Sequence, residues 1–130
     1  MRLPYAPLCA LLGLAIGWLP ALFHGPIPYK FDVLGMHGAV AVWGWYTARM
    51  LIGLLVGITS TPRAWYLRGP LCGALCMLPV GFVALANPGC GPPCLFWNEV
   101  TGAVAGALVA GLAFAATGRH HALDRPASDA

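Results

Sequence analysis

The sequence predicts an all-α integral membrane protein, a four-helix transmembrane bundle with both termini in the cytoplasm. Hydrophobic residues make up 59% of the 130 positions and charged residues only 8%. The mean hydropathy is +0.76, and the apolar residues gather in four runs separated by polar or proline-rich segments. A small soluble domain could not bury so much apolar surface, whereas a bilayer core about 30 Å thick accepts helices of roughly 20 apolar residues.

The four runs define one domain. We expect a transmembrane domain over residues 1–118 and a disordered cytoplasmic tail over residues 119–130. The first run follows Arg2 as in a signal peptide, but no small-residue cleavage site precedes a polar region and three apolar runs follow, so we expect it to be retained. The predicted spans are residues 8–23, 34–58, 71–86 and 95–117.

Proline and glycine mark the connectors. Residues 24–32 contain two prolines, and residues 59–69 alternate arginine with aromatic residues, which favour the headgroup layer. Pro70 suits the first turn of the third helix, and Pro79 is expected to kink it. We expect the segment Cys-Gly-Pro-Pro-Cys over residues 90–94 to be non-helical.

Charge placement predicts the orientation. Basic residues concentrate in cytoplasmic loops of membrane proteins, so the sequence predicts a multi-pass inner-membrane protein. The placement of basic residues in loops also accounts for the net charge of +3. The charge therefore does not indicate an anionic partner, and we expect no nucleic-acid binding. Lys30 alone then faces outward, and the expected cytoplasmic arginines are Arg2, Arg63, Arg68, Arg119 and Arg125.

Glycine spacing predicts close helix packing. Two glycines four residues apart lie on one helix face and let two backbones approach closely, which favours association in lipid. Each run carries such a pair, the third one at the edge of its helix, so we expect one compact bundle. The pairs are Gly13 with Gly17, Gly53 with Gly57, Gly69 with Gly73, and Gly102 with Gly106.

Arg49 is the basic residue inside a predicted span, and its spacing to Gly53 and Gly57 places it toward the bundle interior. It lies roughly 15 Å from the inner end of its helix, too far for its side chain to reach water comfortably. We expect it to bind the Leu75 carbonyl that Pro79 leaves without its helical donor. An anion or lipid-headgroup site is the alternative, and Trp45, one turn away, could stack on the guanidinium.

Glu99 is the carboxylate inside a span, and like His37 it lies near the outer membrane edge. We expect these two side chains to form a hydrogen bond, either as a polar clasp or as a proton-exchanging pair. The depth difference predicts no ion pair between Glu99 and Arg49. A haem, copper or chlorophyll site on His24 and His37 is the weaker alternative, and we expect no cofactor and no metal.

Two cysteine pairs share the spacing C-x-x-x-C. Cys90 and Cys94 fall in the predicted outer loop, where oxidising conditions allow a disulfide. Such a bond would either staple the loop or exchange with thiols. Cys72 and Cys76 fall toward the cytoplasmic half of the third span, away from the outer pair.

No nucleophile with a base, carboxylate pair or phosphate-binding loop is present, so we expect no enzyme activity. The leading expectation is an accessory, assembly or scaffold subunit whose partners are the lipid bilayer and other membrane-protein subunits. Two alternatives remain: a proton-coupled transporter using Glu99 and His37, and a thiol–disulfide oxidoreductase using Cys90 and Cys94.

Overall fold

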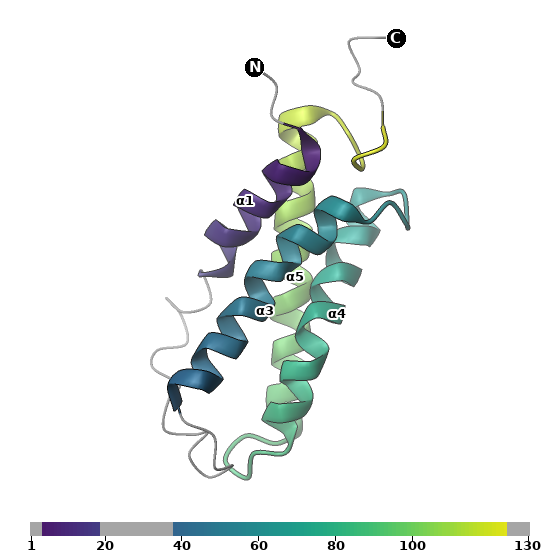
Figure 1. The fold of residues 1–130 in the computed structure, drawn as a ribbon. Coiled ribbons are helices and arrows are strands. Elements are labelled where there is room, and N and C mark those ends of the chain that lie inside the picture. Colours follow the sequence, from purple (N-terminus) through teal and green to yellow (C-terminus); the bar gives the residue numbers. More distant parts are fainter. Residues whose placement is uncertain (1–3, 19–37, 125–130) are drawn as a thin grey trace.

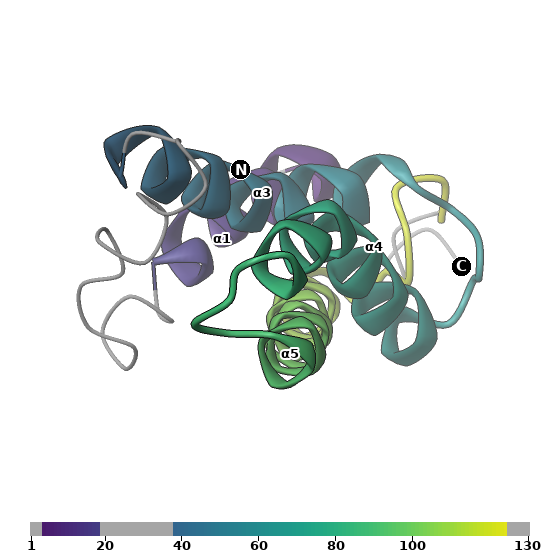
Figure 2. The ribbon, with the colours of Figure 1, turned by 90° about the horizontal axis from the view of Figure 1, so that it is seen from below.

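The computed structural model describes residues 4–18 and 38–124, a part of the chain that is helical and contains no strand. The four helices of the described part run along one long direction (Figure 1). They form a ring in the order α1, α3, α4, α5, and α3 also touches α5 across it (Figure 2). The helices are α1 (Tyr5–Gly17), α3 (Gly38–Ile58), α4 (Trp65–Leu85) and α5 (Pro92–Thr117).

Two of the described helices are long and apolar enough to cross a membrane. These are α4, with 21 residues, and α5, with 26 residues; their apolar 18-residue stretches have mean hydropathies of 1.6 and 1.8. About 20 residues suffice to span the hydrocarbon core. Residues 19–23 of the first predicted span and residues 34–37 of the second lie outside the described residues.

The third and fourth predicted spans begin earlier than expected. Helix α4 starts at Trp65 instead of residue 71, because the Ala64 carbonyl already accepts the Arg68 backbone N–H at 2.9 Å. Helix α5 starts at Pro92, so the expectation that residues 90–94 are non-helical is wrong for their second half. Proline suits a first helical turn because the N–H groups there have no helical acceptor.

Glycine pairs bring the helices into backbone contact. A Cβ atom on Gly13 of α1 would lie 2.6 Å from the Gly53 Cα of α3, and one on Gly102 of α5 would lie 2.6 Å from the Gly73 oxygen of α4. Real Cβ atoms do not approach so closely, so only glycine fits. Gly57, Gly69 and Gly106 are buried against neighbouring helices in the same way, and a Cβ atom on the buried Gly17 would lie 3.2 Å from Met50 of α3.

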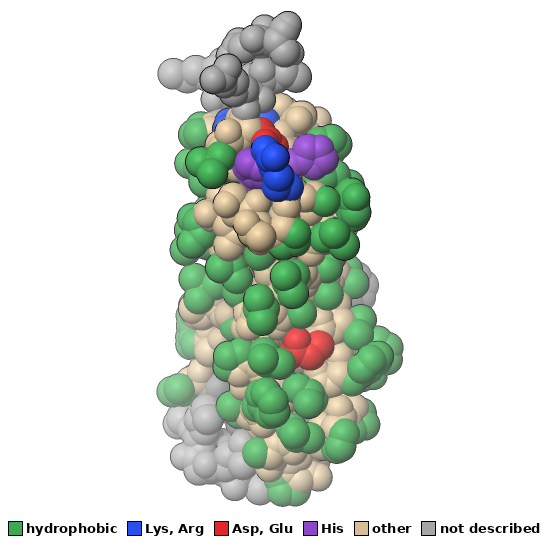
Figure 3. Space-filling model, turned by 90° about the vertical axis from the view of Figure 1, so that its right-hand side faces the viewer, with side chains coloured by type: hydrophobic (Ala, Val, Ile, Leu, Met, Phe, Trp, Pro, Cys, Tyr) green, Lys and Arg blue, Asp and Glu red, His purple; other side chains and the backbone are tan. Residues whose placement is uncertain are grey.

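The interior combines small residues with a few large ones such as Ile52 and Met77, while many large apolar side chains lie on the outside. Cys9, Ala110 and Ala113 are fully buried. Figure 3 shows hydrophobic side chains over most of one face and the positive and imidazole groups gathered at one end. Exposed large residues occur on every described helix, among them Leu11, Trp43, Leu54, Leu75, Phe82, Trp97 and Leu108.

Candidate functional site

A polar layer joins α3 and α5 inside the bundle. Trp45 and Arg49 lie one turn apart on α3, and the Arg49 guanidinium carbon lies 4.3 Å from the centroid of the Trp45 ring. Arg49 Nη2 donates to Thr101 Oγ1 at 2.6 Å, and Trp45 Nε1 donates to Asn98 Oδ1 at 2.9 Å. Asn98 in turn donates through Nδ2 to the Cys94 carbonyl at 2.9 Å. The layer therefore fixes the register of α3 against α5.

Arg49 itself is buried, with 2% of its surface exposed. Its Nε and Nη1 atoms have no hydrogen-bond partner among the described residues. Its bonded partner is Thr101 on α5, not the Leu75 carbonyl on α4, because the side chain turns toward α5. The expected contact with Trp45 is present, and no ion pair joins Arg49 to Glu99 within the described chain.

Glu99 lies on the side of α5 that packs on α4. A Cβ atom on Gly81 would lie 3.1 Å from Glu99 Oε1, and that oxygen is buried without a hydrogen-bond partner in the described chain. His37 and His24 lie outside the described residues, and so do the expected Glu99–His37 hydrogen bond and the histidine pair.

The cysteines separate into one bonded pair and three free thiols. A disulfide joins Cys90 to Cys94 across the turn before α5, with their Cα atoms 5.5 Å apart. Cys72 is buried in α4, and its Sγ lies 3.3 Å from Thr59 Oγ1. Cys9 is buried in α1, and Cys76 is partly exposed. No cluster of three or more His, Cys, Asp or Glu side chains that could hold a metal occurs in the described part.

A second polar centre, which the sequence interpretation missed, lies at the end of the bundle where α1 and α4 begin. Arg68 is fully buried there, not in an interfacial loop. It donates through Nη2 to Tyr5 Oη at 2.6 Å and to the His120 carbonyl, and through Nη1 to the Arg63 carbonyl at 3.3 Å. Tyr5 Oη also donates to the His120 carbonyl at 3.1 Å. Arg68 thus ties α1 and α4 to the chain that follows α5.

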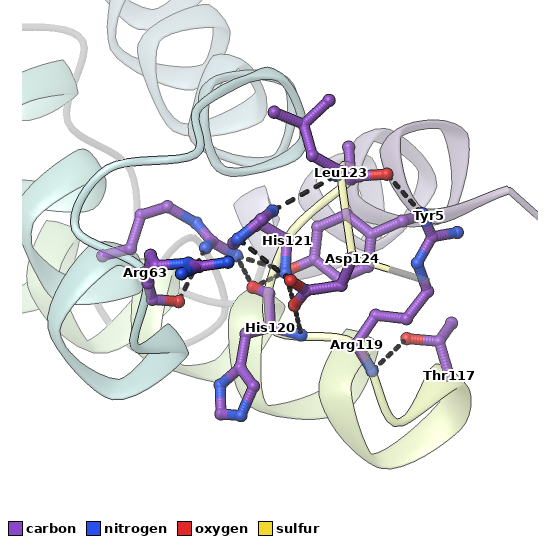
Figure 4. A network of polar contacts seen from close by, with 10 residues as sticks. Tyr5, Arg63, Thr117, Arg119, His120, His121, Leu123 and Asp124 are labelled. Atoms are coloured by element: carbon purple, nitrogen blue, oxygen red, sulfur yellow. Dashed lines mark hydrogen bonds and ion pairs between the residues drawn. The ribbon is translucent and has the colours of Figure 1, made fainter. Parts of the chain in front are cut away.

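Residues 119–124 form a folded turn, which corrects the expectation of a disordered tail for this stretch; residues 125–130 lie outside the description. Gly118 ends α5 with a φ of 67°, a left-handed conformation that favours glycine and turns the chain back. The turn then packs on α1 and α4 (Figure 4). The i,i+4 spacing of Arg68 and the buried Cys72 is the signal that could have placed Arg68 inside.

His121 and Asp124 close this turn. His121 Nε2 lies 3.1 Å from Asp124 Oδ1, and the Leu123 N–H donates to His121 Nδ1 at 3.2 Å. Neutral His121 therefore carries its proton on Nε2, facing the carboxylate. Burial alone would raise the pKa of Asp124, but the backbone N–H groups of His120 and His121, together with their imidazoles, lower it below its ordinary value.

An apolar groove opens between α3 and α4, with a volume of about 650 Å³. Gly44 lies in it, and a Cβ atom there would meet no other atom within 4 Å. The groove is therefore a place where α3 presents bare backbone to its surroundings. Its lining residues are Val40, Trp43, Gly44, Thr47, Ala48 and Leu51 from α3, and Cys76, Pro79 and Val80 from α4.

These features define an all-helical protein with two candidate membrane-crossing helices, a buried arginine in its middle and a second buried arginine at one end. Comparison with protein-family models, with curated proteins and with solved structures finds no match to the chain.

Proposed function

We propose that this protein is a noncatalytic accessory, assembly or scaffold subunit that spans an inner membrane four times and binds another membrane protein through the groove between α3 and α4. The groove around Gly44 is the observation that carries the proposal. Its partner is a transmembrane helix of that other protein.

The membrane environment is favoured by the surface of α4 and α5. Only 39% of the apolar stretch of α4 and 33% of that of α5 is buried inside the bundle. A core helix of a soluble protein would be mostly buried, and the rest of these surfaces carries Leu, Val, Phe and Trp side chains. In lipid, apolar side chains on the outside of the bundle carry no free-energy penalty of exposure to water.

A helix is the occupant that matches the packing rule of this chain. The two tightest interfaces, α1 with α3 and α4 with α5, both use glycines spaced four residues apart. Those eight glycines already pack against helices of this chain and are not available to a partner helix. Gly44 and the half-buried Ala48 repeat the four-residue spacing on α3, and within the described chain no helix covers Gly44. A partner helix would therefore meet α3 there as α1 does at Gly53.

Native mass spectrometry after gentle extraction from the protein's own membrane tests the role. Heavier assemblies are expected for the native chain, and Gly44→Leu should abolish them, because the new side chain would enter the groove from a position where a Cβ atom meets no other atom within 4 Å. Ala115→Leu is the matched control, since Ala115 is exposed on α5, and it should keep the assemblies. A lone chain under all conditions, or assemblies that survive Gly44→Leu, would contradict the proposal.

Both termini belong in the cytoplasm on this proposal. The hydrogen bond from Tyr5 to the His120 carbonyl holds the start of α1 and the end of α5 together, and Arg63, Arg68 and Arg119 lie at that end. Single cysteines placed in a cysteine-free chain test the orientation with an impermeant maleimide on spheroplasts. Pro88→Cys should react and Arg63→Cys should not. The reverse pattern would invert the orientation.

Thiol–disulfide exchange is a second candidate, favoured by the Cys90–Cys94 bond and by the partial exposure of both residues. It predicts that the oxidised protein accepts electrons from a dithiol and is reoxidised by a membrane quinone. Cys90→Ser should abolish turnover. A disulfide that is reduced once and is not reoxidised by quinone would have a structural role only.

A further inference from the structure

We infer that Arg49 binds a small inorganic anion, such as a halide, in the middle of the bundle. The side chain is 98% buried, given its 2% exposure, and the N–H groups of Nε and Nη1 have no partner in the described chain. A guanidinium carries five N–H donors in a rigid fork and stays charged at any physiological pH. The protein therefore presents a fixed positive charge with donors left for a ligand.

The neighbours of Arg49 supply contacts but no compensating charge. Thr101 Oγ1 accepts from Nη2, and as a donor it binds the Trp97 carbonyl at 2.8 Å, so it acts as a neutral acceptor. The Trp45 ring covers one side of the guanidinium at 4.3 Å. Within the described chain, no carboxylate lies within ion-pair distance of Arg49. A buried charge without a counter-ion is strongly unfavourable, and an anion removes that cost where water cannot.

Depth separates a free anion from a lipid headgroup. Arg49 lies 11 residues after Gly38 and 9 residues before Ile58 in α3. At about 1.5 Å per residue, roughly 14–17 Å of helix lie on either side of it. Headgroup phosphates at the ends of the helix are therefore out of reach, and a small ion that enters the bundle is the ligand that fits.

Iodide quenching of Trp45 tests the site, because an iodide held on Arg49 would lie against the indole stacked on it. Trp45 is only 7% exposed, so quenching by random collision should be weak. We would replace Trp18, Trp43, Trp65 and Trp97 by Phe and titrate sodium iodide into the micellar protein, with sodium gluconate keeping the ionic strength constant. A saturable loss of fluorescence, reversed by chloride, is expected.

Two variants separate binding from structure. Arg49→Gln should remove the saturable component, leaving weak linear quenching, while Thr101→Val should keep it because the N–H groups of Nε and Nη1 remain. Linear quenching equal in all three proteins would mean that only water fills the site, and it would overturn the inference. If the Phe replacements prevent folding, the linewidth of the ³⁵Cl resonance on the otherwise native chain gives the same answer. Broadening by the native chain and not by Arg49→Gln is expected, and equal linewidths would overturn it.

Discussion

Gly13 of α1 and Gly53 of α3 lie in backbone contact, such that a Cβ atom on Gly13 would sit 2.6 Å from the Gly53 Cα and 2.8 Å from the Met50 carbonyl oxygen. Because all of these neighbours are backbone atoms, no side-chain rotation can make room. Dispersion contacts at this distance hold α1 on α3, and contacts of this kind are what drive helix association in lipid.

Gly13→Ala should therefore separate α1 from α3. Overpacking of this kind costs about 1–3 kcal/mol of unfolding free energy, measurable as a lower midpoint of thermal unfolding followed by circular dichroism in micelles. Gly44→Ala is the matched control, because a Cβ atom at Gly44 meets nothing within 4 Å. Alanine there should be neutral or stabilising by up to about 1 kcal/mol, since it favours helix over glycine. Equal midpoints for both variants would show that the glycine contact contributes nothing.

Four-residue glycine spacing was enough to predict which helix faces are buried, because the spacing is a property of one helix. Gly53 and Gly57, or Gly102 and Gly106, share a face whatever packs on it. The same locality explains the predicted contact of Trp45 with Arg49, which are one turn apart.

Partners distant in sequence could not be predicted. Arg68 contacts Tyr5 across 63 positions, and Arg49 contacts Thr101 across 52. An arginine close to Trp65 and Tyr66 has the local pattern of an interfacial loop, and only the position of α1 beside α4 shows that it is buried. The start of α5 was misplaced for a different reason: consecutive prolines break a helix interior but suit its first turn.

Arg68→Gln should release the turn that follows α5. Its guanidinium joins Tyr5, Arg63 and His120, and hydrogen bonds to a charged group contribute about 1.5–3 kcal/mol each. We expect a clear loss of thermal stability and faster trypsin cleavage after Arg119, read by intact mass.

Arg63→Gln is the control for this change. It removes the same charge, but the Arg63 side chain is exposed and only its carbonyl takes part in the cluster. It should leave both readouts close to those of the native chain. If trypsin cleaves the two variants at one rate, Arg68 does not hold the turn.

Asp124 should make the stability of the turn depend on acid pH. Its pKa is lowered in the folded protein, because the N–H groups and imidazoles of His120 and His121 outweigh the opposing effect of burial. Because this pKa is lower in the folded state, the carboxylate contributes its full stabilisation at pH values above its ordinary pKa of about 3.9. The stabilisation is lost as the pH falls through the pKa of the folded state. Relative to Asp124→Asn, the native chain should be more stable by up to about 1 kcal/mol at pH 5.

That advantage should disappear at the most acidic pH. Unfolding midpoints of the native chain and Asp124→Asn, compared between pH 5 and pH 2, measure it. A difference between the two proteins that stays constant over this range would exclude the carboxylate as its source.

The Cys90–Cys94 bond should leave three thiols available and stabilise the turn before α5. Alkylation of the unfolded, unreduced chain is expected to modify Cys9, Cys72 and Cys76, and all five cysteines after reduction. Closing so short a loop restricts the unfolded chain by about 2 kcal/mol, so Cys90→Ser should lower the unfolding midpoint. Cys76→Ala, which removes a free thiol from the groove, should change it little. Five alkylated thiols before reduction would mean that the pair is not bonded in the isolated protein.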